Sequence, residues 1–149
     1  MNLGELCNRN PIFAYRDTSL GEAARLMREH HVGSLVIVIE RLGERFPVGI
    51  LTDRDIVVST VAKDLDPRGL ICGDVMSADL IALREDASVA DALALMRERG
   101  VRRMPVVNDR GSIAGIITLD DLLSLVGAEL NEFARVIEWQ RRREAALRG

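Results

Sequence analysis

The sequence predicts an α/β fold of two tandem β-α-β-β-α units, packed face to face with pseudo-twofold symmetry and followed by a C-terminal helix. Three observations predict it: an internal repeat, the same order of helix caps and β-branched runs in both copies, and enough apolar residues for a core. Of the 149 residues, 48% are hydrophobic and 29% are charged, which is typical of a folded globular chain. Such a chain can bury about 68–70% of its unfolded surface.

The repeat is visible by direct alignment. Residues 19–29 match residues 88–98 at an offset of 69, and the same offset pairs Gly4 with Gly73. Residues 49–55 match residues 115–121 at an offset of 66, so the first copy carries three more residues, which we place in a loop at residues 40–46. We therefore expect one unit at residues 3–64, a second at 70–126 and a helical extension at 127–149, with Pro67 and Gly69 in the linker.

Each copy begins with a short extended segment, at residues 11–14 and 80–83, and continues into a helix. Ser19 with Glu22, and Ser88 with Asp91, have the spacing of capping boxes. Apolar residues then recur at i, i+3, i+4 and i+7, which is the pattern of a helix with one buried face. These residues are Leu20, Ala23, Ala24 and Met27 in the first copy, and Val89, Ala92, Leu93 and Met96 in the second.

Two β-branched runs follow the helix in each copy. They lie at residues 35–39 and 48–51 in the first copy and at 105–107 and 113–117 in the second, and their Val and Ile content favours strands. Thr52 and Thr118 then begin a second helix. Helices on one face of a three-stranded sheet leave the other face open, and a facing second unit would cover it.

Composition and charge exclude several classes of protein. The longest apolar run, residues 35–39, is far shorter than the roughly 20 residues of a membrane span, and the N-terminus has no signal-peptide pattern. A net charge of −3 argues against nucleic-acid binding through phosphate contacts. Cys7 and Cys72 form no metal-binding motif with the adjacent His30 and His31, so we expect no metal site and two reduced thiols in a cytoplasmic protein.

At this point the sequence resembles a known family. The glycine-to-aspartate segments at residues 49–55 and 115–121, together with residues 74–77 and 101–107, are similar to those of tandem CBS domains, also called a Bateman module. The resemblance covers roughly residues 3–126. It implies that an adenine nucleotide (AMP, ADP or ATP) binds in clefts between the two units.

The resemblance implies a role for four residues: Thr52, Asp55, Thr118 and Asp121 would face the clefts, with the aspartates accepting hydrogen bonds from ribose hydroxyls. A carboxylate suits this role because it only accepts hydrogen bonds and can take two hydroxyl donors. The alternative is purely structural, because T-x-x-D before an apolar run is also a capping box. The repeat context favours binding, and one threonine can serve both roles.

The resemblance also implies phosphate contacts from Arg102, Arg103 and Arg54. The first-copy counterparts of Arg102 and Arg103 are uncharged and the second-copy counterpart of Arg54 is Asp120, so we expect unequal clefts. Arg102 and Arg103 would serve the Asp55 cleft and Arg54 the Asp121 cleft; alternatively, all three are solvated. Candidate adenine-wall residues, each of which is otherwise core, are Ile12, Val32, Leu35, Ile81, Val101 and Met104.

The C-terminal extension has a heptad-like apolar seam. Leu123, Val126, Leu130, Phe133 and Ile137 alternate at spacings of three and four. The helix either packs back on its own units or meets its counterpart in a homodimer.

Three functions remain to be compared. The first is a regulatory module that senses an adenine nucleotide and acts through an unidentified effector protein, with S-adenosylmethionine or NAD as other candidate ligands. The second is a structural dimerisation module with unused clefts. The third, an enzyme, is disfavoured because the sequence has no catalytic constellation, P-loop or G-x-G-x-x-G segment, so we expect no catalytic residue and no required cofactor.

Overall fold

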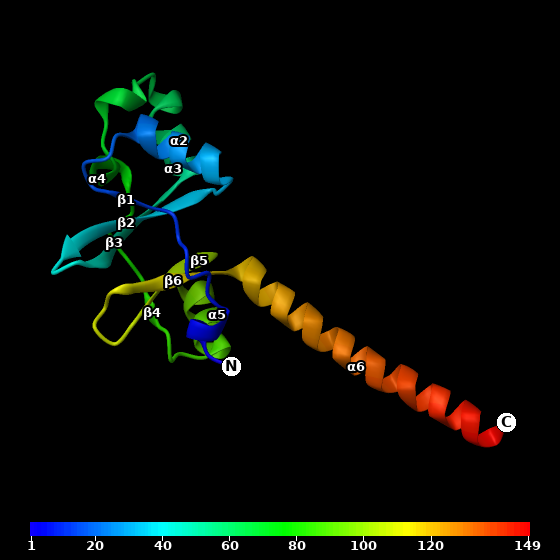
Figure 1. Cartoon of the computed structure of the whole chain (residues 1–149). Helices are drawn as coiled ribbons and strands as arrows, with labels where there is room; N and C mark the ends of the chain where they lie inside the picture. Colours follow the sequence, from blue (N-terminus) through cyan, green and yellow to red (C-terminus); the bar gives the residue numbers. More distant parts are fainter.

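The computed structural model describes residues 1–149 and contains two units, each built on its own three-stranded sheet, and a long C-terminal helix (Figure 1). The first half of the chain contains α1 (Leu3–Leu6), β1 (Phe13–Tyr15), α2 (Leu20–His30), β2 (Ser34–Arg41), β3 (Glu44–Thr52), α3 (Asp53–Ser59) and two 3₁₀ turns, η1 (Val61–Lys63) and η2 (Pro67–Gly69). The second half contains α4 (Cys72–Val75), β4 (Leu83–Arg84), α5 (Val89–Arg99), β5 (Arg103–Val107), β6 (Ile113–Thr118) and α6 (Leu119–Arg148).

The two sheets have the same topology. In the first, β1 pairs with β2 in parallel and β2 pairs with β3 antiparallel; in the second, β4, β5 and β6 pair in the same way. Equivalent residues occupy equivalent positions, since Ser34 lies opposite Thr52 in one sheet and Arg103 opposite Thr118 in the other. The predicted α/β architecture of two repeated units is therefore confirmed.

Side-chain caps fix where the helices begin. Ser88 and Asp91 form a reciprocal capping box at the start of α5. Ser19 caps α2 by accepting from the backbone N–H of Glu22, without the reciprocal bond that the sequence predicted. Gly100 ends α5 in the left-handed region, a conformation that glycine adopts without steric cost.

The first helix of each unit crosses over to the other unit. Leu3 and Cys7, around α1, are buried in the core of the second unit, whereas Cys72 of α4 is buried in the core of the first. Backbone bonds hold both crossings: Leu3 N–H donates to Ala87 O at 3.0 Å, and Cys72 N–H donates to Thr18 O at 2.8 Å. The two units are thus interlocked, which the sequence did not predict.

The segments after these helices pair with the last strand of the opposite unit. Asn8 exchanges two backbone hydrogen bonds with Ile116, and Ser77 exchanges two with Ile50. These contacts repeat with the offsets of the sequence repeat, as pseudo-twofold symmetry requires. Val36 and Val38 of β2 are fully buried although they belong to neither helix-covered core, as expected if the units face each other.

Three details differ from the sequence predictions. Residues 40–46 are not a loop but extend β2 and β3 into a long hairpin, whose turn at Leu42 and Gly43 has positive φ at both positions. The linker, for which the sequence indicated only the breakers Pro67 and Gly69, forms the 3₁₀ turn η2 at these residues, and the turn η1 lies just before it. Ala24 of α2 and Leu93 of α5, predicted on the apolar helix faces, are exposed. The buried face of each helix is therefore narrower than the spacing of its apolar residues indicated.

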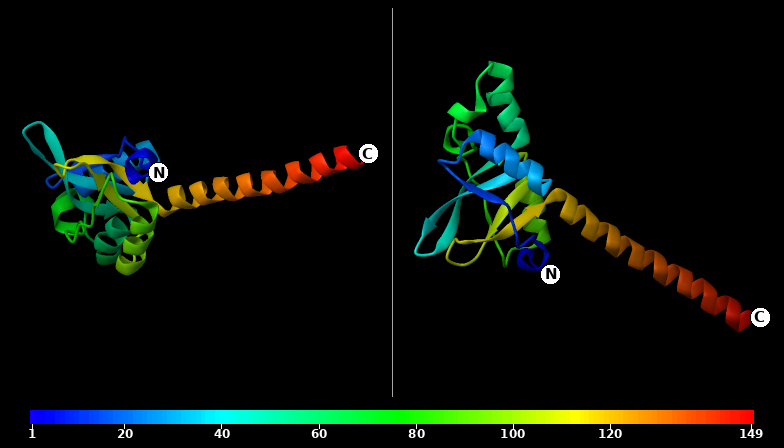
Figure 2. Two further views of the ribbon diagram at one scale, coloured as in Figure 1. Left: turned by 90° about the horizontal axis from the view of Figure 1, so that it is seen from below. Right: turned by 45° about the horizontal axis from the view of Figure 1, so that its top comes forward.

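The C-terminal helix α6 is continuous from the second unit to the end of the chain. Its first turn packs on the second core through Leu122, and beyond that it projects away from both units (Figures 1 and 2). The alternative in which the extension packs back on its own units is therefore wrong. No helix in the chain, α6 included, combines the length and apolar character needed to cross a membrane.

Both cysteines are free, as predicted, and they lie in different cores. Burial raises the pKa of the Cys72 thiol to about 11. Burial also raises the pKa of the Cys7 thiol, against a smaller opposing effect of Arg9. Both groups are protonated at neutral pH and act as small core side chains.

Candidate functional site

A cavity of about 600 Å³ opens where the two units meet. This volume is within the range of roughly 300–1,000 Å³ that is typical of small-molecule sites. The first unit contributes Gly33, Ile50, Thr52, Asp53, Arg54 and Asp55, and the second contributes Ser77, Asp79, Leu80, Ile81, Gly100, Val101, Arg102, Arg103 and Met104. Neither unit alone encloses this space.

The backbone framework of the cavity is set by the crossing segment. Ile50 and Ser77 exchange hydrogen bonds of 3.3 and 3.0 Å, which hold the segment before β4 beside β3. Within the first unit, the N–H of Asp53 donates to the carbonyl of Gly33 at 3.0 Å. The start of α3 is therefore fixed relative to both units, and so are the side chains of its first turn.

Thr52 and Asp55 line the cavity and also form the capping box of α3. The N–H of Asp55 donates to Thr52 Oγ1 at 3.1 Å, and the N–H of Thr52 donates to Asp55 Oδ2 at 2.9 Å. The structural alternative weighed from the sequence is thus realised. Asp55 Oδ1 accepts no hydrogen bond within the chain, so capping leaves half of this carboxylate available to a ligand hydroxyl.

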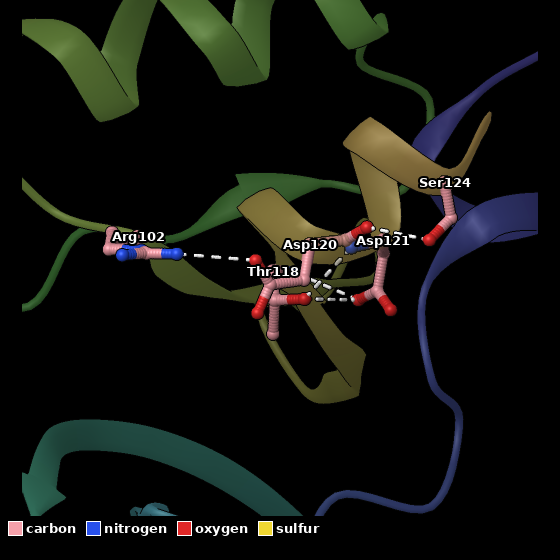
Figure 3. Close-up of polar contacts among 5 residues, drawn as sticks. All are labelled: Arg102, Thr118, Asp120, Asp121 and Ser124. Carbon is pink, nitrogen blue, oxygen red and sulfur yellow. Dashed lines mark hydrogen bonds and ion pairs between the residues drawn. The ribbon is translucent and has the colours of Figure 1, made fainter. Parts of the chain in front are cut away.

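The second pair, Thr118 and Asp121, forms the equivalent capping box at the start of α6 (Figure 3). Here Thr118 Oγ1 also donates to Asp121 Oδ2 at 2.8 Å, so the two side chains satisfy each other. Asp121 is exposed, whereas Asp55 is half-buried. Neither Thr118 nor Asp121 lines the cavity, so the structure separates the two predicted pairs.

The three arginines singled out from the sequence all line the same cavity. Arg102 and Arg103 come from the second unit and share the cavity with Asp55, as predicted. Arg54 also lines this cavity, whereas the sequence interpretation placed it at the Asp121 cleft. Arg54 reaches this cavity because it lies in the first turn of α3, between Asp53 and Asp55.

Arg102 pairs with a residue that does not line the cavity. Its Nη2 lies 3.2 Å from Asp120 Oδ1 in the first turn of α6 (Figure 3). Both side chains are largely exposed, at 68% and 78%, so this pair contributes no more than about 1 kcal/mol. Asp120 therefore holds Arg102 weakly at the cavity edge.

Half of the proposed apolar wall is present. Ile81, Val101 and Met104 line the cavity. Their first-unit counterparts Ile12, Val32 and Leu35 do not line it and belong to or pack against the first core.

Sequence reasoning missed several polar lining residues. Asp53, Ser77 and Asp79 line the cavity, and the one sequence signal for Ser77 was its place in residues 74–77, a segment that carries the family resemblance. With Asp55 and the three arginines, the cavity holds three carboxylates and three guanidinium groups. Such a site suits a ligand with both hydroxyl donors and anionic groups. The structure contains no group of three or more His, Cys, Asp or Glu arranged to hold a metal ion.

Comparison with known proteins supports the repeat. The sequence model described as "CBS domain" matches twice, at residues 3–60 and 72–128. An uncharacterized protein of Methanopyrus kandleri is 38% identical over 125 residues, which are 84% of this chain and 62% of that relative's own length. A CBS domain-containing protein of Bacillus subtilis is 36% identical over 104 residues, or 70% of each chain.

A solved structure shares the fold. The CBS domain pair of a protein crystallised with 5′-methylthioadenosine and S-adenosyl-L-methionine superimposes with a TM-score of 0.75 at 27% identity, covering 87% of this chain and 98% of that one. The arrangement of two units and their sheets is therefore one already seen in a protein with adenosine-containing ligands.

Proposed function

The chain belongs to the CBS-domain family, and from this premise we propose that it senses an adenosine-containing nucleotide, AMP, ADP or ATP, in the cavity between its units. The observation that carries the proposal is the meeting of Asp55 from one unit with Arg102 and Arg103 from the other in one cavity. A ligand that contacts both bridges the units, and it shifts their arrangement only to the extent that it binds one arrangement more tightly.

Each part of the nucleotide has a chemically suitable partner. Asp55 Oδ1 has no partner within the chain and accepts from a ribose hydroxyl, while Oδ2 keeps its capping bond. Arg102, Arg103 and Arg54 supply guanidinium groups, which pair with phosphate in a bidentate manner. The apolar side chains of Ile81, Val101 and Met104 supply a surface for the base.

S-adenosylmethionine is the second candidate, and the carboxylates favour it. Asp53 and Asp79 would face the positive charges of that ligand, and the similar CBS domain pair was crystallised with it. The two candidates differ in their use of arginine: phosphates need Arg102 and Arg103, whereas a sulfonium does not.

We propose unequal occupancy of the two clefts. The residues related by the repeat to Arg54, Arg102 and Arg103 are Asp120, Gly33 and Ser34, so the cleft of Thr118 and Asp121 has no equivalent phosphate ligands. Anionic nucleotides therefore fill the Asp55 cavity first.

Titration calorimetry on the full chain with adenosine, AMP, ADP, ATP, NAD and S-adenosylmethionine tests the proposal. Asp55→Asn retains an oxygen that can cap Thr52 but loses the carboxylate charge. We expect it to weaken nucleotide binding by about 10–100-fold, the value of a charged hydrogen bond. Asp121→Asn is the matched control because it alters the equivalent capping box outside the cavity; it should leave the first binding event unchanged.

Arginine variants then separate phosphate from base recognition. The Arg102→Ala/Arg103→Ala double variant should weaken the binding of ATP by at least about tenfold and the binding of adenosine by less than twofold. Equal losses for both ligands would contradict phosphate contact. Absence of binding by every ligand at millimolar concentration would reject ligand sensing and favour the structural dimerisation module.

A further inference from the structure

The projecting helix α6 carries an exposed apolar seam that nothing in its own chain covers. Leu130 is 62% exposed, Phe133 70% and Ile137 54%. With the heptad positions continued, the seam comprises Leu123, Val126, Leu130, Phe133, Ile137, Gln140, Glu144 and Leu147, which we call the α6 seam. From Leu123 to Leu147 it runs along roughly 36 Å of helix axis.

Backbone hydrogen bonds alone do not keep a helix of this kind folded when it is isolated in water. Beyond its first turn, α6 buries no residue against the two units. Helices in water gain most of their stability from packing an amphipathic face. The α6 seam therefore calls for a second apolar surface of similar length, and its spacing of three and four is that of a helix partner.

The charges on α6 divide into two sets. Those away from the seam pair within the helix: Arg135 with Glu132 at 2.8 Å, and Arg142 with Glu138 at 2.5 Å. Those that flank the seam, namely Glu129, Arg141, Arg143 and Arg148, form no ion pair within the chain. The unpaired charges thus lie at the positions that contact a partner helix in a coiled coil.

The sign of these charges changes along α6. From Leu119 to Glu138 the helix carries five acidic residues and one basic residue, whereas from Trp139 to Arg148 it carries four basic residues and one acidic residue. In a parallel pair, the basic halves would lie together and Glu144 of one seam would face Glu144 of the other. In an antiparallel pair, each acidic half lies against a basic half.

We propose that α6 pairs with α6 of a second copy of this chain as an antiparallel coiled coil. The two seams pack together around Phe133 and Ile137, and Glu129 lies beside Arg143 of the second copy. Twofold symmetry makes this charge pair twice. The resulting dimer holds two nucleotide cavities at opposite ends of a helical bar, and its formation does not depend on any ligand.

Charge reversal tests both the contact and its direction, with dimer dissociation measured by sedimentation velocity on the full chain. Glu129→Arg or Arg143→Glu alone should raise the dissociation constant by about tenfold, because two attractive pairs become repulsive. The Glu129→Arg/Arg143→Glu double variant restores opposite charges only in the antiparallel arrangement, and we expect it to return within about threefold of the unaltered chain. Arg135→Glu, on the outer face, is the matched control and should change the constant by less than about threefold.

A seam variant provides an independent reading. Leu130→Glu should abolish the dimer at concentrations up to about 100 µM while leaving the melting temperature of the two units unchanged, since this side chain contacts neither unit. A chain that is monomeric at that concentration without any substitution would overturn the proposal. So would single charge reversals that tighten the dimer, which indicates parallel helices because each reversal then relieves repulsion between like-charged halves. A dimer that survives Leu130→Glu would also overturn it, because that result indicates an interface elsewhere.

Discussion

Replacing Gly49 with alanine should disrupt the contact that interlocks the two units and, with it, the wall of the cavity. A Cβ atom at this position would lie 2.8 Å from the carbonyl oxygen of Ser77 and 2.7 Å from Met76 Sδ. The methionine side chain can move, but Ser77 is held by two backbone hydrogen bonds to Ile50. The new methyl group therefore has to displace the crossing segment itself.

The size of the effect follows from what the displacement removes. Overpacking of a tight contact costs about 1–3 kcal/mol, and each of the two hydrogen bonds between Ile50 and Ser77 contributes about 1 kcal/mol. Alanine also lowers the conformational entropy of the unfolded chain, and this effect offsets about 0.4–1 kcal/mol of the loss in stability. We expect a net loss of about 2–4 kcal/mol in the free energy of unfolding, or roughly 5–15 °C in melting temperature for a chain of this size.

Urea unfolding of three variants measures this expectation. Gly115→Ala is the symmetry-related change, where a Cβ would lie 2.5 Å from Asn8 O and 2.6 Å from Cys7 Sγ, and it should cost at least as much. Gly69→Ala has no atom within 4 Å of the added Cβ and should stay within about 1 kcal/mol of the unaltered chain. Ser77 lines the cavity proposed for the nucleotide, so of the three variants only Gly49→Ala should also weaken ligand binding in the folded state. The reasoning is refuted if all three variants unfold at the same urea concentration.

Three further expectations concern the thiols, the cavity edge and the projecting helix. Burial raises the pKa of Cys72 to about 11, so the folded chain keeps a proton that the unfolded chain releases from about pH 9. The free energy of unfolding should therefore fall as pH rises from 9 to 11, by up to about 1.4 kcal/mol per pH unit for this thiol. Cys7, whose pKa burial also raises, adds to the fall. Urea unfolding in this window checks it, and the fall should shrink in Cys72→Ala. Asp120→Asn frees Arg102 and should tighten binding of ATP by up to about fivefold without affecting adenosine, which calorimetry measures. Gly127→Ala, whose added Cβ meets no atom within 4 Å, should stabilise α6 by up to about 1 kcal/mol, seen as a higher midpoint for the thermal loss of its helical signal in circular dichroism. An unchanged midpoint would contradict a helical residue 127 that packs on neither unit.

The sequence predicted the local structure well where short-range rules decide it. Ser88 caps α5 and Thr52 caps α3 as their spacing requires, because capping depends only on residues three apart in the chain. The repeat itself predicted two units with one topology, and this is confirmed by the sheet pairings. The extended hairpin at residues 40–46 was missed because its Leu42–Gly43 turn is a weaker signal than Asn-Gly or Asp-Gly.

Long-range contacts set the limit of the prediction. The exchange of α1 and α4 between units depends on which core receives Leu3 and Cys72, and an internal repeat is equally compatible with packing inside each copy. The same exchange brings Ser77 and Asp79 to the cavity between the units. Ser77 belonged to the family-like segment at residues 74–77 and Asp79 to no motif, and neither position by itself predicted a contact with the first unit. Gly49 was the one local indication of the exchange, because a glycine before the Thr-x-x-Asp segment leaves space for the backbone of the segment that crosses from the other unit.

Arg102 sits between the proposed nucleotide site and the helix that we propose as the dimer contact. It lines the cavity, and it pairs with Asp120 in the first turn of α6 at 3.2 Å. An anion that binds Arg102 competes with Asp120 for the same guanidinium group. Because coupling between two sites is reciprocal, any change that strengthens the Arg102–Asp120 pair lowers the affinity of the cavity for the anion. The exposure of this pair bounds its energy at about 1 kcal/mol, so this route couples cavity and helix by no more than about fivefold. A larger effect of nucleotide on dimerisation would have to pass through the interlocked units themselves.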